Sequence, residues 1–324
     1  MSEDRCGLTV NFKGQVKEMA KKMININLKQ GQLAGLPEAY RLEQNPLSKI
    51  MFQSDTKVAA DQALLQTEGL KEAVQVIADP LVCTRLFCVS ARGELRILEV
   101  FCSKQDAYVR LRGEENDYLT MLEGTAAEFT EGMLMPEGDP EAPRLIMNCT
   151  EDAVWTVLGV AEMKRRMYLN SMLTGEKIID IDDKPIGALN AVAKDVFAQR
   201  TDYRHVIPFM QLFTGARRKP DSAKMYEELV QAGFLNDKGA VTGNGAYILN
   251  SLSSIHAMMG IQWLHLGQDN KTRMSTMAYF NCYHSYWCFT PETGDEKAML
   301  FTLNREEIKH DLAEIYKINN SEKQ

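Results

Sequence analysis

The chain has 324 residues, of which 37 are basic and 44 are acidic, giving a formal net charge of −7, and 45% of its residues are hydrophobic. This composition excludes the disordered, collagen-like and fibrous classes. No apolar run reaches the ~20 residues that a membrane helix needs, so we expect no membrane insertion. The acidic balance argues against a nucleic-acid partner.

Seven cysteines, an odd number in a long chain, favour reduced thiols over a disulfide framework. The first residues, Met1 to Arg5, lack the basic-then-apolar order of a signal peptide. Together these features lead us to expect a cytoplasmic protein.

The first half of the chain is predicted to form helices followed by a meander of strands. Apolar residues at helical spacing predict one helix over Val16 to Met23 and another from Gln62 through Leu70 to Ile77. Runs rich in β-branched and aromatic residues follow, and they predict an antiparallel meander. Its strands are expected at residues 84–90, 94–101, 107–111 and 117–122.

The middle of the chain is predicted to hold a loop, a strand and one long helix. Residues 135–143 are rich in Pro, Gly and Asp and are expected to form an exposed loop. A strand is expected over residues 144–149. Thr150 then suits the N-cap of a helix that ends at Gly175. Lying between two similar units, this helix is expected to bridge them.

The second half repeats the pattern of the first. A helix is expected through Leu189, Val192, Val196 and Phe197, and another from Asn244 to Met259. Asn304, with Glu307 three residues later, suits the start of a final helix. The strands between them are expected at residues 263–267, 273–280, 286–289 and 297–303.

Corresponding elements of the two halves lie about 180 residues apart (280 − 101 = 179 and 252 − 70 = 182). This spacing predicts an internal duplication. The fold class is therefore expected to be α+β, with two pseudo-symmetric subdomains, each an antiparallel meander flanked by helices, joined by a central helix. The predicted boundaries are 1–131 for the first subdomain, 132–184 for the linker with its helix, and 185–324 for the second.

Aromatic residues gather in the second half, at Trp263, Tyr279, Tyr286 and Trp287 among others. Aromatic side chains are enriched in protein interfaces, although a sheet core is the alternative reading. Tyr283 falls at a predicted hairpin tip, where the first half carries Lys104. This difference between matched tips suggests that the second half binds a partner.

Two other kinds of function stay open, although no catalytic motif is evident. Cys282, His284 and Cys288 form a loose group of metal-ligand residue types, without the second pair that a zinc site usually has. The segment from Leu229 to Gly243 is similar to the helix-to-wing segment of winged-helix regulators, but the helix after it carries no Lys or Arg. No cofactor is expected.

The two matched blocks, Leu70 to Leu122 and Leu252 to Leu303, resemble in their topology the EspG family, the substrate chaperones of type VII (ESX) secretion. The resemblance implies a non-enzymatic adaptor. Such an adaptor holds a helical-hairpin secreted protein, here one of the WXG100 or LXG type, through its C-terminal subdomain. The contact region would map onto residues 263–287 and the final helix, with Ile315 and Tyr316. Whether the protein also forms a homodimer stays open.

The leading hypothesis is therefore a chaperone that buries apolar partner surface against the second half. The residues predicted to bind the partner are Trp263, Tyr279, Tyr283, Tyr286, Trp287, Ile315 and Tyr316.

Overall fold

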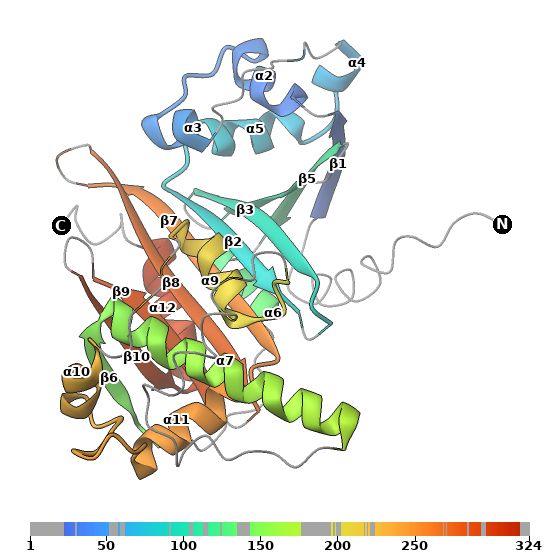
Figure 1. Cartoon of the computed structure of the whole chain (residues 1–324). Coiled ribbons are helices and arrows are strands. Elements are labelled where there is room, and N and C mark those ends of the chain that lie inside the picture. Colours follow the sequence, from blue (N-terminus) through green and yellow to red (C-terminus); the bar gives the residue numbers. More distant parts are fainter. Residues whose placement is uncertain are drawn as a thin grey trace.

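The computed structural model places ten antiparallel strands in a single sheet, with helices on both of its faces (Figure 1). The strand order is β1-β5-β4-β3-β2-β7-β8-β9-β10-β6. The α+β fold class expected from the sequence is confirmed. The structure describes residues 23–29, 31–51, 58, 62–90, 92–103, 106–112, 116–123, 125–134, 143–175, 196, 198, 202–216, 218, 220, 224–267, 269, 271–283, 285–292 and 296–317.

The first five strands form one half of the sheet, and their helices lie on both faces. The strands are β1 (Met23–Lys29), β2 (Val82–Val89), β3 (Leu95–Ser103), β4 (Asp106–Arg112) and β5 (Asn116–Glu123). The helices are α2 (Gln32–Ala39), α3 (Pro46–Met51), α4 (Gln62–Leu65), α5 (Leu70–Ala78) and α6 (Ala126–Leu134). β1 pairs with β5 and so forms the outer edge.

The other five strands form the second half. The strands are β6 (Ile146–Thr150), β7 (Ala257–Leu266), β8 (Thr272–Cys282), β9 (Ser285–Pro291) and β10 (Lys297–Leu303). The helices are α7 (Glu151–Thr174), α9 (Val206–Thr214), α10 (Tyr226–Gln231), α11 (Gly243–Ser253) and α12 (Arg305–Lys317). β6 pairs with β10 at the other edge.

The two halves join where β2 pairs with β7, so the hydrogen-bond ladder runs unbroken through the centre of the sheet. Each half places its first strand outside the last strand of a four-stranded meander. The two halves share this strand order, which is a likeness of arrangement and does not by itself show a common origin. The duplication of an ancestral segment and the proposed subdomain boundaries remain predictions.

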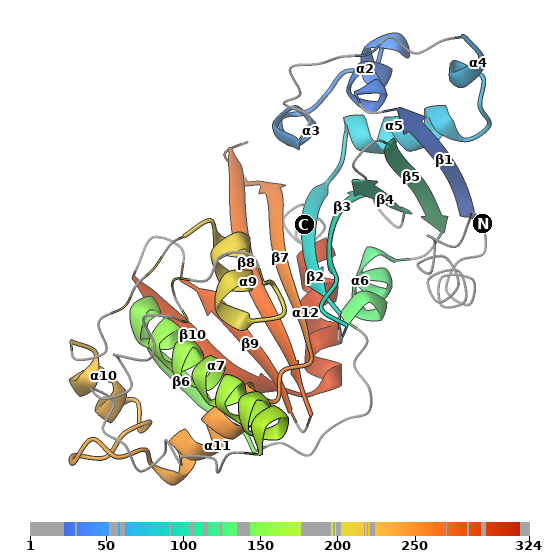
Figure 2. The same cartoon turned by 45° about the vertical axis from the view of Figure 1, so that its right-hand side comes forward.

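Alternation along the strands divides the core between the two faces. On one face α2, α3 and α5 cover the first half of the sheet, and α7, α9, α10 and α11 cover the second. On the opposite face α6 and α12 pack against each other over the centre (Figure 2). In β2, Phe87 and Val89 point to the first face, and Val82 and Leu86 point to the second.

The helix α7 begins and ends as the sequence indicated. The Thr150 hydroxyl accepts a hydrogen bond from the Ala153 N–H at 3.3 Å, and Gly175 takes the left-handed conformation (φ 72°) that ends the helix. This helix was expected to bridge both halves. Its main contacts are with α9, α11, β6 and β10, and its core cluster also takes in Phe87 of β2.

Other element boundaries differ from the expectation. Gly69 (φ 76°) separates α4 from α5, and an added Cβ there would lie 2.3 Å from the Ile24 side chain. The helix expected through Met259 ends at Ser253, and Met258 and Met259 lie in β7. Met23 begins a strand, whereas the rest of its predicted helix lies outside the described residues.

The expected helix near Leu189 is described only at Val196 and Ala198, and both residues are helical.

Candidate partner-binding surface

Of the seven residues predicted to bind a partner, the structure leaves one exposed. Tyr283 has 76% of its surface exposed. The other six are buried: Trp263, Tyr279, Tyr286, Trp287, Ile315 and Tyr316. The six buried side chains therefore offer a partner little surface, and the role of all seven residues in binding remains a prediction.

The polar atoms of two buried rings are bound inside the fold. The Trp287 N–H donates to the hydroxyl oxygens of Ser251 at 2.7 Å and Ser285 at 2.9 Å. The Tyr316 hydroxyl lies 2.9 Å from the Thr84 hydroxyl and 2.8 Å from the Thr130 hydroxyl. A buried polar group needs a hydrogen-bond partner, and these hydroxyls supply one to each ring. Trp287 and Tyr316 can therefore lie in the core without an unpaired polar atom.

Tyr283 lies at the turn between β8 and β9. Its backbone N–H donates to the Ser254 hydroxyl at 3.3 Å, which holds the turn against the end of α11. Its ring meets the His256 ring edge-on, with the centroids 6.0 Å apart. Its neighbours therefore position the tyrosine, while most of its surface stays exposed.

The alternative metal site is not supported by the geometry. Cys282 packs with Phe280 and Trp287 on one face of the sheet, and Cys288 packs with Tyr279 on the opposite face. One ion cannot reach both sulfurs. Burial raises the pKa of the Cys282 thiol to about 12, which disfavours the thiolate that binds metals. His284 lies outside the described residues.

The alternative winged-helix segment is a packing unit. Leu235 and Val241 form a small antiparallel bridge between α10 and α11. The apolar residues of α11, Ile248, Leu249 and Leu252, face the core that includes α7. With no Lys or Arg in α11, the helix offers no cationic side chain to nucleic-acid phosphates.

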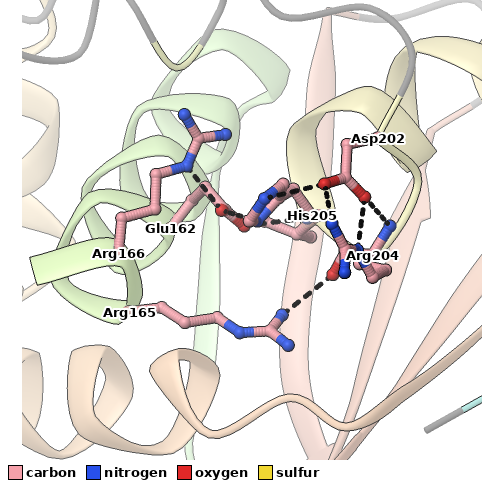
Figure 3. A network of polar contacts seen from close by, with 7 residues as sticks. Glu162, Arg165, Arg166, Asp202, Arg204 and His205 are labelled. Atoms are coloured by element: carbon pink, nitrogen blue, oxygen red, sulfur yellow. Dashed lines mark hydrogen bonds and ion pairs between the residues drawn. The ribbon is translucent and has the colours of Figure 1, made fainter. Parts of the chain in front are cut away.

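A polar network fixes α7 to the start of α9 (Figure 3). The buried Glu162 carboxylate accepts hydrogen bonds from Arg166 Nε and from the Val206 N–H, both at 2.9 Å, and contacts His205 Nδ1. Because Val206 is the first residue of α9, Glu162 places a negative charge at that helix N-terminus.

The surroundings of Glu162 favour its charged form. Burial alone would raise the pKa of Glu162, but hydrogen bonds from His205, Arg166 and the Val206 N–H outweigh burial and hold this pKa below its ordinary value. Next to it, His205 Nε2 lies 3.4 Å from Asp202, which is paired with Arg204. The network therefore links a buried charge to the surface.

Beyond this network α7 projects from the body, as Figure 1 shows. Nearly every residue from Glu151 to Lys164 is buried, whereas the last turns carry exposed apolar side chains. Met172 is 83% exposed and Leu173 is 86% exposed. We name the exposed set the α7 stripe: Tyr168, Leu169, Met172 and Leu173.

Sequence reasoning missed this surface, because apolar residues recur at helical spacing in both the buried and the exposed part of α7. One signal was available. Three consecutive cations, Lys164, Arg165 and Arg166, interrupt the apolar pattern at the point where the helix leaves the core.

The chain is an α+β protein that exposes apolar side chains at Tyr283 and along the α7 stripe. No described helix has the length and apolar character that crossing a membrane requires. No protein-family model matches the chain, and no curated protein matches it.

Among solved structures, the chain is similar to the type VII secretion system chaperone EspG5 of Mycobacterium tuberculosis, determined in complex with a PE25-PPE41 dimer. The match covers 91% of this chain and 96% of that chain, with 8% sequence identity and a TM-score of 0.45. The name of this solved structure is that of the family that the sequence resembles.

Proposed function

We propose that the protein is a non-enzymatic chaperone or adaptor that acts in the cytoplasm and binds a helical secreted partner through its C-terminal half. The observation that carries this proposal is the exposed Tyr283 ring, held in place on the turn between two buried strands. A large ring that is already positioned loses little conformational entropy on binding. Rings of this kind often supply most of the binding energy of an interface.

The partner class follows from the resemblance stated for the sequence, a helical hairpin of the WXG100 or LXG type. Its apolar end would be kept from aggregating by burial against Tyr283 and the neighbouring surface. A standard interface buries ~1,600 Å² in total, so further residues around the turn would take part.

The test is co-expression of the full chain with a WXG100-type protein encoded nearby, followed by affinity measurement. Tyr283→Ala should weaken binding about 30-fold or more, which corresponds to a hot-spot loss of ~2 kcal/mol. The matched control is Tyr118→Ala in β5, a tyrosine 44% exposed in the other half of the sheet. Equal binding by wild type and a folded Tyr283→Ala variant would contradict the proposed site.

A further inference from the structure

The α7 stripe has the geometry of one side of a helix pair. Tyr168 and Met172 are four residues apart, as are Leu169 and Leu173, so the four side chains form two adjacent ridges on one helix face. Ridges of this spacing fit the grooves between the ridges of another helix. The shape of the stripe therefore favours a helix over a flat surface as its occupant.

The helix that carries the stripe is anchored to α9 at its base. Arg165 Nη1 donates to the Arg204 carbonyl at 3.0 Å, and Glu162 binds the N-terminus of α9 one turn earlier. At the far end the Gly175 N–H donates to the Ser171 carbonyl at 2.8 Å. A helix fixed at its base and closed at its end is preorganised for binding, which lowers the entropy cost of docking.

The positive charge of Arg165, beside the stripe, indicates which polar side chains a partner would carry. Arg165 has no carboxylate partner in the described part of the chain, and α7 carries no acidic side chain after Glu162. An acidic side chain on the partner would complement this cation. A second copy of the chain would place its own Arg165 cation opposite the first, which is unfavourable. An anionic membrane is disfavoured by the net charge of −7.

We propose that the α7 stripe is a docking site for an amphipathic helix of a partner protein, with an apolar face against Met172 and Leu173 and acidic side chains toward Arg165. This inference goes beyond the proposed chaperone function, because it requires neither Tyr283 nor secretion of the partner.

The first test places a photo-cross-linking amino acid at Met172 in the full chain, in cells that express it natively, with Asn170 on the polar side of the same helix as the control position. The proposal expects cross-links from Met172 to a segment of another protein that has helical apolar spacing and flanking Asp or Glu. Cross-links confined to lipid or to a second copy, a captured segment without that pattern, or no cross-link at all would overturn it.

The second test measures the affinity of the purified full chain for the captured segment as a synthetic peptide. Met172→Glu with Leu173→Glu should weaken binding at least tenfold, and Asn170→Ala should leave it unchanged. Replacing the Asp and Glu residues of the peptide by Asn and Gln should weaken binding severalfold at low salt. Because the substituted side chains are exposed, circular dichroism should find all variants folded.

If the double variant binds the peptide as wild type does, the docking site is refuted, whatever Tyr283→Ala does. If Tyr283→Ala alone abolishes binding of the secreted partner, the proposed function stands without the α7 stripe.

Discussion

Glu162 joins two helices that are distant in the sequence, and its substitution tests whether they depend on it. Glu162→Gln removes the charge that Arg166 and His205 face, inside a buried site. We expect the free energy of unfolding to fall by about 3 kcal/mol, as when one partner of a buried ion pair is removed. Urea unfolding measures this. Arg204→Ala, which removes an exposed ion pair with Asp202, should change the free energy of unfolding far less than Glu162→Gln does.

The same carboxylate predicts the dependence of stability on pH. Because the folded state lowers the pKa of Glu162, the stabilisation is present above the unfolded pKa of about 4.3 and is lost as the pH falls through the lower folded value. Urea midpoints of wild type should therefore fall below about pH 4.3, and Glu162→Gln should flatten this fall. Parallel curves for the two proteins would show that Glu162 does not contribute.

At the scale of elements, α9 packs on β7 through a glycine. A Cβ added at Gly260 would lie 2.4 Å from Cδ2 of the Phe213 ring, and the Gln262 side chain donates to the Phe213 carbonyl at 2.7 Å. Gly260→Ala should therefore displace α9 and lower the free energy of unfolding by about 1–3 kcal/mol. The matched control is Gly243→Ala at the start of α11, where no atom lies within 4 Å. Equal thermal stability of both variants would contradict this packing.

How far the sequence predicts these elements depends on how their faces are covered. The meanders and both ends of α7 follow from turn residues and caps such as Thr150. β9 is buried on both faces, so alternation could not tell which of Tyr286 and Trp287 faces which helices. The boundary between α11 and β7 was missed because an apolar run fits either element. The contact of Glu162 with His205 joins residues 43 positions apart and has no local signal.

At the scale of the whole molecule, the two halves share a core and should unfold together. The Tyr316 hydroxyl of α12 bonds Thr84 of β2 and Thr130 of α6, so the last described helix is tied to the first half. We expect one calorimetric transition with equal calorimetric and van't Hoff enthalpies. Tyr316→Phe should lower the free energy of unfolding by about 1–2 kcal/mol without splitting the transition. Two separate transitions in wild type would contradict a shared core.

Hydrogen–deuterium exchange of the full chain, alone and with a bound helical secreted partner, tests most directly whether the protein acts as a chaperone through its C-terminal half. Peptides covering the turn at Tyr283 should become protected in the complex, and those covering β1 and β5 should exchange as before. Protection confined to residues 23–134, with the Tyr283 turn unchanged, would contradict the proposed function.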